Sequence, residues 1–472
     1  MPNLSDSEGE ARDSGPVTSV WPCIAGNLLL RLGNSATGVL MGLVLAAIDR
    51  QYGGVPATAV GLLAASFYVA ELLGAPVFGT LSDRYGRRRF LIAGPIFGAV
   101  AIQLIGWPSL LIGLPLLLIP MALGRVIEGL STATTAPSTL SFLSAATAHS
   151  ASLRGRVMSW YEIATVVGIG FGFVAAGLLW DRLGHGAFLA VTAIYGAALL
   201  AFTLVAETAE TQAPEAKSLS ALAGRRSLSP PPLRGRVRER GSEPRSPFRD
   251  VLGKPRLLRF APAWLCVNTI VGVWFTHSAF QLTGERRAGQ FLSGEFTGSS
   301  MGAVFAMFSV AFMLGVFLWG LAIGRRQKTS LMLVTTLGIY VICVALFALN
   351  RTGAAGGPLL TVLTAAFLLG VVIASGFTPA ALAYLADISE EMAEHRGTVM
   401  GLYSVMLGLG QLLGGALGGP FAQAGGVDGL ILLTALLGSA ALVVLVLLHV
   451  KEQRPFTVRG ELVEPHPSTG SG

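Results

Sequence analysis

The chain has 472 residues, of which 52% are hydrophobic and only 12% are charged, and its mean hydropathy is +0.65. A soluble protein carries about 25% charged residues, so this composition excludes a soluble enzyme and predicts an integral membrane protein. The net charge of +7 does not indicate nucleic-acid binding, because the arginines fall in the gaps between apolar runs, where cytoplasmic loops would hold them.

Apolar stretches long enough to cross a bilayer, which takes about 20 residues, follow one another along the chain. In chain order the twelve predicted spans are 22–47, 57–80, 89–107, 110–146, 157–179, 187–206, 260–281, 298–322, 330–349, 358–387, 398–421 and 428–449. The fourth and tenth are long and contain prolines, so we expect bends or ragged ends there. The spans fall into two six-helix bundles, residues 22–206 and 257–450.

Three polar segments lie outside these bundles. Residues 1–21 are acidic, unlike a cleavable signal peptide, so we treat the first apolar run as a retained helix. Residues 207–256, with three consecutive prolines and many arginines, indicate a largely disordered linker, and residues 451–472 form an unstructured tail. Both could alternatively be regulatory or lipid-binding segments. Most of the 33 lysines and arginines lie on the same side as these segments, which predicts a multi-pass protein of the inner (plasma) membrane with both termini cytoplasmic.

The two halves are sequence repeats. A shift of 242 residues aligns 137–177 with 379–419 without a gap. Pro137, Arg154, Gly155, Met158 and Tyr161 recur as Pro379, Arg396, Gly397, Met400 and Tyr403. Shared composition would match some glycines and leucines, but it would hardly match an Arg-Gly pair, a methionine and a tyrosine in register. The repeat therefore predicts two parallel six-helix units, a plan on which transporters are built.

The most informative motif is residues 79–88, G-T-L-S-D-R-Y-G-R-R, between the second and third spans. Its glycines permit close packing and a tight turn, and one acid stands among several arginines. The segment resembles the signature loop of the major facilitator superfamily of secondary transporters. The resemblance covers about 22–450 and implies an all-α membrane fold of twelve helices in two repeats, which transports by alternating access.

The resemblance also implies a gating role for this loop. In the family, the equivalent of Asp83 sits against the N-terminus of helix 11, where the helix dipole and free N–H groups favour a negative charge. Arg84 and Arg88 would complete an ion-pair latch that holds the cytoplasmic side shut. The gating candidates are Gly79, Asp83, Arg84, Gly86, Arg87 and Arg88.

The fourth span carries two charges on an otherwise apolar helix. Arg125 and Glu128 are followed by Thr132 and Thr135 at helical spacing, so the four residues lie on one stripe. A charge inside a membrane normally faces a cavity or a partner. Arg125 and Gly129 match an R-x-x-x-G pattern that the family links to proton coupling. Glu128 is then a protonatable partner, or the two charges form a fixed pair that only satisfies itself.

Three more charges lie inside spans. Arg31 lies in the first, Glu71 in the second and Glu162 early in the fifth. Because the first two helices run in opposite directions, Arg31 and Glu71 should sit at similar depth, and they could pair. Acids inside membranes often belong to proton relays, so the proton-coupling candidates are Glu71, Arg125, Glu128 and Glu162.

The seventh span adds polar residues. Trp274 and His277 share one helix face. His277 could titrate or be a hydrogen-bonded packing residue, and Trp274 could stack on a substrate or belong to an interfacial belt. Together with polar residues of the first and fourth spans, the substrate-cavity candidates are Arg31, Asn34, Thr132, Asn268, Trp274 and His277.

The fifth span is rich in glycine. A dinucleotide-binding loop would need a preceding strand, which a membrane span lacks, so the glycines indicate a helix-packing face. They resemble the G-x-x-x-G-P-x-x-G-G motif of drug–proton antiporters, with Phe173 in place of the proline and Ala176 in place of a glycine. The packing glycines are Gly168, Gly172 and Gly177, with Gly410 and Gly414 in the eleventh span.

Together these features predict a secondary active transporter, with proton-coupled efflux of small apolar or amphiphilic compounds favoured. Proton-coupled or facilitative uptake of a sugar or other small metabolite is the first alternative, and a non-transporting membrane sensor or scaffold is the second. Because no catalytic constellation occurs and the three cysteines lack metal or disulfide spacing, we expect no enzyme activity, cofactor or metal. The expected partners are a small-molecule substrate, protons and the bilayer, and the expected state is a monomer.

Overall fold

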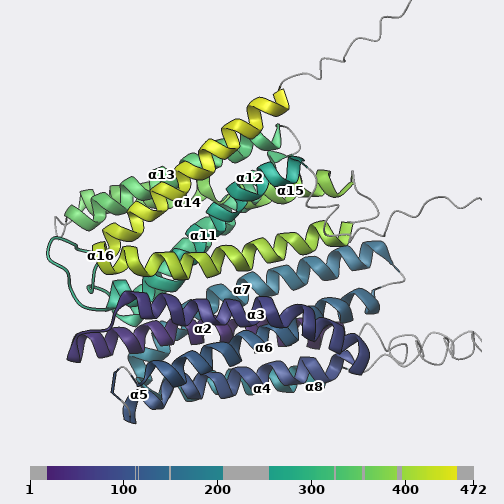
Figure 1. The fold of residues 1–472 in the computed structure, drawn as a ribbon, viewed down its shortest axis with the longest axis horizontal. Helices are drawn as coiled ribbons and strands as arrows, with labels where there is room; N and C mark the ends of the chain where they lie inside the picture. Colours follow the sequence, from purple (N-terminus) through teal and green to yellow (C-terminus); the bar gives the residue numbers. More distant parts are fainter. Residues whose placement is uncertain are drawn as a thin grey trace, which may run out of the picture.

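The computed structural model describes residues 19–111, 113–114, 116–147, 150–205, 255–323, 326–352, 357–390 and 396–453. Every regular element within these ranges is a helix, and the helices form two bundles, one above the other in Figure 1. The predicted all-helical fold is therefore confirmed. The predicted linker, the acidic N-terminus and the tail lie almost wholly outside the described residues.

Each half has its own set of helices. The N-terminal half comprises α2 (Val20–Tyr52), α3 (Ala57–Tyr85), α4 (Arg87–Gly106), α5 (Pro108–Leu111), α6 (Leu118–Ala146), α7 (Ala151–Leu183) and α8 (Gly186–Thr203). The C-terminal half comprises α11 (Pro255–Thr283), α12 (Gly298–Gly320), α13 (Lys328–Thr352), α14 (Pro358–Ala374), α15 (Phe377–Glu390) and α16 (Arg396–Gln453). We call the end that carries residues 53–56 and 284–297 the loop end, and the opposite end, where α2 begins and α16 ends, the tail end (Figure 1).

The fourth predicted span, 110–146, begins later than expected. Residues 108–111 form the one-turn helix α5, and α6 starts only at Leu118. Pro120 then falls in the first turn of α6, where a missing N–H costs nothing. The tenth predicted span, 358–387, is divided into α14 and α15 around Gly376, where a Cβ would lie 2.4 Å from the ring of Trp319.

Ten helices of the described residues are long and apolar enough to cross a membrane. The predicted count of twelve is larger for two reasons. The charges and hydroxyl groups of α6 lower its hydropathy, and α16 joins the predicted spans 398–421 and 428–449 into one helix that breaks at Gly426, with φ 59° and ψ −135°. A positive φ of this kind favours glycine. The two additional spans therefore stay a prediction.

Among the residues whose side chains the structure describes, the two halves are joined at the loop end and have separate buried clusters at the tail end. They meet through α3 with α16, α7 with α12 and α2 with α11. One buried cluster contains residues of both halves, such as Val60 and Leu45 with Phe280 and Met301. At the tail end, by contrast, the buried residues form two clusters, each within a single half. The structure is thus closed between the halves at the loop end.

Close helix packing depends on glycine in α16. A Cβ on Gly414 would lie 2.4 Å from the carbonyl oxygen of Thr269 and 2.5 Å from the amide nitrogen of Val273, both backbone atoms of α11. We expect Gly414→Ala to lower the free energy of unfolding by about 1–3 kcal/mol, the usual cost of overpacking. Thermal unfolding of the purified protein in detergent measures it. Gly425→Ala on the same helix is the control, because a Cβ there meets nothing within 4 Å; equal loss in both variants would contradict the packing role.

Candidate functional site

The charged residues of α6 form the centre of a buried polar cluster in the N-terminal half. The guanidinium of Arg125 donates to Glu128 one helical turn away, and the two side chains are 6% and 0% exposed. The guanidinium also lies 4.7 Å from the ring centroid of Phe67 on α3, a cation–π contact. Nε of Arg125 and Oε1 of Glu128 are buried without a hydrogen-bond partner among the described residues. The pair is therefore incompletely satisfied, and one oxygen of Glu128 is available to another partner.

A second part of the cluster connects α2, α6 and α8. The amide nitrogen of Asn34 donates to the hydroxyl of Thr132 at 2.8 Å. The hydroxyl of Tyr195 donates to the amide oxygen of Asn34 at 2.8 Å and lies 3.1 Å from the hydroxyl of Thr37. Sequence reasoning missed Tyr195, a fully buried tyrosine on α8. The one available signal was a hydroxyl in the middle of a very apolar span.

Arg31 lies at the tail-end side of this cluster. Its side chain interacts electrostatically with Tyr161 of α7 and with Glu71 and Glu162. No ion pair within 4 Å joins it to either acid in the part of the chain that the structure describes. Glu71 also interacts electrostatically with Arg125, whereas Glu162 is exposed. Of the acids, Glu71 is thus the one that connects Arg31 with the α6 pair.

The hydroxyl stripe of α6 is packed between helices. Ser131 donates to the carbonyl of Gly94 on α4 at 2.6 Å, and Thr135 donates to the carbonyl of Ser131 at 2.8 Å. Thr132, a substrate-cavity candidate, is 1% exposed beneath Asn34. Because their hydroxyls are satisfied by the bundle itself, these residues fix the rotation of α6 about its axis.

The three substrate-cavity candidates on α11 each form a hydrogen bond with a different neighbour. Asn268 donates to the carbonyl of Trp264 within its own helix at 2.9 Å, and Trp274 donates to Thr434 of α16 at 2.9 Å. His277 is 0% exposed, and its Nε2 lies 3.1 Å from the carbonyl oxygen of Gly415. None of these bonds reaches the N-terminal polar cluster, so the structure does not bring the seventh-span candidates together with those of α2 and α6.

The packing glycines of α7 lie against the backbone of α2. A Cβ on Gly168 would lie 2.6 Å from the carbonyl oxygen of Leu28, and one on Gly172 would lie 2.6 Å from that of Leu32. A Cβ on Gly177 would clash with α12 of the other half, and a Cβ on Gly410 would clash with Asn268 of α11. Only glycine permits these approaches, which bring Arg31 on α2 close to α7.

Phe173, which stands where the antiporter motif has proline, takes part in an aromatic contact between the halves. Its ring centroid lies 4.3 Å from that of Phe305 on α12 and 5.2 Å from that of Phe275 on α11. The side chain is 7% exposed. Sequence reasoning recorded only that the proline was missing. The three rings fill the space between α7, α11 and α12 on the loop-end side.

The segment 79–88 is mostly helix, which corrects the expectation of a loop between spans that end at 80 and begin at 89. α3 continues to Tyr85, and only Gly86, with φ 95° and ψ 128°, leaves the helical conformation. A positive φ requires glycine there. At Gly79 a Cβ would meet Pro137 at an ordinary 3.6 Å, so this glycine lies within helix packing.

The charged residues of this segment contact their own half. Asp83 accepts from Ser141 of α6 at 3.2 Å and pairs with Arg87 at 3.6 Å. Arg88 donates to the carbonyl of Thr203 at the end of α8 at 2.9 Å, and Arg84 is exposed. The predicted partner of Asp83 is the N-terminus of the eleventh predicted span, which is the start of α16. The side chains at that end of α16 are not among those that the structure describes.

Two charged residues that sequence reasoning passed over join the halves at the loop end. Asp181 of α7 accepts the backbone N–H groups of Gly298 and Ser299 at 3.0 and 2.7 Å. These are unpaired donors of the first turn of α12, where the helix dipole favours an anion. Arg50 of α2 donates to the carbonyl oxygens of Gly284 and Gly294 at 2.9 and 3.2 Å. Polar contacts therefore join the two halves at the loop end, where the three aromatic rings also lie.

Comparison with known proteins identifies the family. The family model described as Major Facilitator Superfamily matches residues 23–294 and 287–468. "Multidrug resistance protein 3" of Bacillus subtilis (strain 168) is 35% identical over 82 residues, and the match covers 15% of each chain. Among the described residues, no group of His, Cys, Asp and Glu could hold a metal ion.

Solved structures share the fold over nearly the whole chain. The nucleoside transporter NupG has a TM-score of 0.64 at 12% identity, and the match covers 92% of this chain and 99% of that one. A bacterial homologue of the human drug peptide transporters PepT1 and PepT2 has a TM-score of 0.58 at 16% identity and covers 92% and 98%. At these identities the likeness is one of fold.

Proposed function

Because this chain belongs to the Major Facilitator Superfamily, we propose that it is a proton-coupled secondary transporter that exports small apolar or amphiphilic compounds by alternating access. The observation that carries the proton coupling is the Arg125–Glu128 pair, buried in α6 with one carboxylate oxygen unpartnered. Uptake of a proton by Glu128 would neutralise its carboxylate and break the ion pair with Arg125. The guanidinium of Arg125 would then pair with Glu71 instead. This exchange of partners is the coupling step of the proposal.

The orientation of the chain gives the proposal a direction. With the basic side of the protein in the cytoplasm, the tail end faces the cytoplasm and the closed loop end faces outward. The conformation is then the one that takes up substrate from the inside. The short match to "Multidrug resistance protein 3" supports export.

Uptake of a polar metabolite is the second candidate. The polar cluster of Asn34, Tyr195 and Arg31 favours it, because an apolar cargo needs no such hydrogen-bonding groups. Proton dependence and direction of flux separate the two candidates.

Proton release from energised inverted vesicles on addition of a panel of lipophilic compounds tests the proposal. We expect a compound-triggered pH change in the wild type and none in Glu128→Gln. The matched control is Glu295→Gln, since Glu295 pairs with Arg286 at 2.8 Å on the exposed surface of the loop end; it should behave as the wild type. No response to any compound, with the protein shown folded and inserted, would contradict efflux and place metabolite uptake first.

A further inference from the structure

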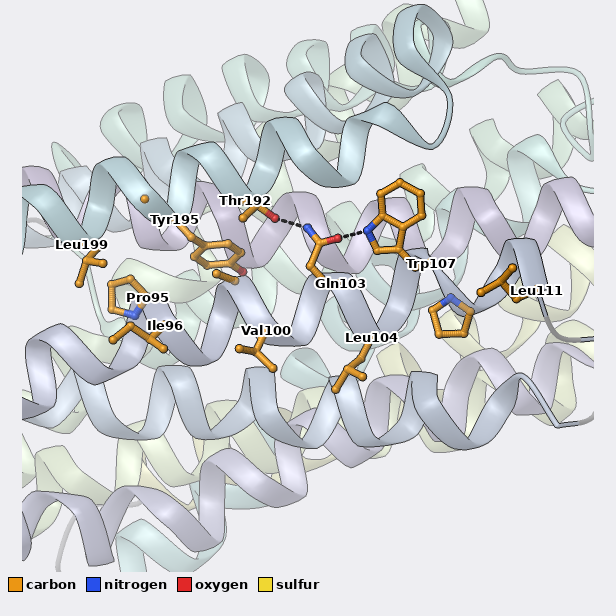
Figure 2. A pocket seen from close by; sticks show the side chains of 13 residues that line it. Pro95, Ile96, Val100, Gln103, Leu104, Trp107, Leu111, Thr192, Tyr195 and Leu199 are labelled. Atoms are coloured by element: carbon orange, nitrogen blue, oxygen red, sulfur yellow. Dashed lines mark hydrogen bonds between the residues drawn. The ribbon is translucent and has the colours of Figure 1, made fainter.

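A groove lies between α4 and α8 (Figure 2). Figure 1 places these two helices on the side of the N-terminal half that faces away from the C-terminal half. Its volume is about 630 Å³, within the range of ligand sites. No residue of the polar cluster except Tyr195 lines it. It is therefore separate from the proposed transport site.

The groove opens to the bilayer. Ile96 and Val100 of α4 are 45% and 48% exposed, and Leu111 of α5 is 83% exposed, all along the same groove. α4 spans the membrane by length and composition. Apolar side chains exposed on such a helix are exposed to lipid, so the groove continues the lipid-facing surface of the protein.

The groove runs along α4 for about the depth of one leaflet. Its lining follows α4 from Pro95 to Trp107 (Figure 2) and continues to Leu111 of α5. At 1.5 Å per residue the part along α4 is about 18 Å, a little more than half of a hydrocarbon core of about 30 Å. Trp107, 43% exposed, lies near the loop-end limit of this part, where α4 meets α5, and an exposed tryptophan is typical of the membrane interface.

The polar groups of the wall are already paired. Nε1 of Trp107 donates to the side-chain oxygen of Gln103. The side-chain nitrogen of Gln103 donates to Thr192 of α8 (Figure 2). A ligand would find no open hydrogen-bonding group in this row, so the groove suits an unbranched apolar chain better than an amphiphilic cargo.

Tyr195 separates this groove from the polar cluster. It belongs to the groove wall, but it is 0% exposed and its hydroxyl donates to Asn34. Gly98 of α4 and Gly33 of α2 pack against the ring so closely that a Cβ would lie 2.3 and 2.8 Å from it. The protein itself therefore holds the ring in place, and a ligand in the groove lies outside it.

We propose that the α4–α8 groove binds the acyl chain of a membrane phospholipid from the leaflet at the loop end. The binding does not depend on the proposed direction of transport. The site takes one chain of the lipid, and the headgroup lies beside Trp107.

Photo-crosslinking tests this site. The full-length protein is reconstituted with a phosphatidylethanolamine that carries a diazirine midway along one acyl chain, illuminated and mapped by mass spectrometry. We expect adducts on Leu104 and Leu199 at several-fold the density found on the lipid-facing residues Val334, Leu337 and Val344 of α13. Equal density on the two surfaces would show ordinary contact with bulk lipid and would overturn the proposal.

A groove-filling variant provides the second arm. A Cβ on Gly196, in the groove wall, meets nothing within 4 Å, so a larger side chain can leave the helix there and occupy the groove; we use Gly196→Trp, with Gly196→Leu as a smaller alternative. We expect groove adducts to fall to the α13 level in these variants. Gly320→Trp is the matched control, because Gly320 on α12 is equally open and lies outside the groove. Unchanged labelling in the Gly196 variants, or loss of labelling when an apolar compound rather than unlabelled lipid is added, would contradict an acyl-chain site.

Discussion

Arg125→Ala is expected to lower the free energy of unfolding by about 3–5 kcal/mol, because it leaves the carboxylate of Glu128 unpaired in a site that is 0% exposed. The double variant Arg125→Met with Glu128→Leu should recover most of that loss, since apolar residues of similar volume often replace a buried ion pair at little cost. We expect the double variant to fold and to lose compound-triggered proton release. Thermal unfolding and vesicle flux, measured on the same preparations, separate the two effects.

An exposed pair of the same chemistry serves as the control for the Arg125 variants. Arg286→Ala removes the ion-pair partner of Glu295. Because this pair is exposed to solvent, the free energy of unfolding should not change by more than about 1 kcal/mol. A double variant that still transports with proton release would mean that the α6 pair is only structural. In that case Glu71, the other acid that interacts with Arg125, would become the first proton-carrier candidate.

Asp181→Ala is expected to open the loop end. The substitution removes the acceptor for the N–H groups of Gly298 and Ser299 at the start of α12. A capping contact of this kind is worth about 0.5–2 kcal/mol, so the ratio of open to closed protein should rise about 2- to 30-fold. The readout is a cysteine at Ala57, which is 2% exposed between the halves and donates its N–H to Gln423 of α16.

Labelling of this cysteine by a membrane-impermeant maleimide, with the three native cysteines replaced, should be faster in Asp181→Ala than in its parent. Asp428→Asn is the control. Asp428 is a loop-end acid that bonds Asn350 and Arg351 within the C-terminal half, so its loss should leave the labelling rate unchanged. Equal labelling in Asp181→Ala and its parent would show that Asp181 does not hold the halves together.

Segments whose role depends on their own sequence were predicted well. The run 79–88 and the repeat of 137–177 in 379–419 led to the family, and the family match confirms it. The same reasoning placed the whole of 79–88 in a loop, because it did not allow for an acid and arginines at the end of a helix; the turn itself is tight, and only Gly86 leaves the helix. It also extended the fourth span by eight residues at its start, where Pro120 marks the first turn of α6.

The sequence by itself determined that this protein is helical, crosses the membrane and belongs to its family, because the length of an apolar run and a local motif are properties of one segment. Only the tertiary structure decided the partners inside the bundle. Tyr195 reaches Asn34 across 161 residues, and Asp181 reaches Gly298 across 117. Such contacts depend on how far each helix is rotated about its axis and on how closely glycines such as Gly172 let helices approach, and both are set by packing between segments.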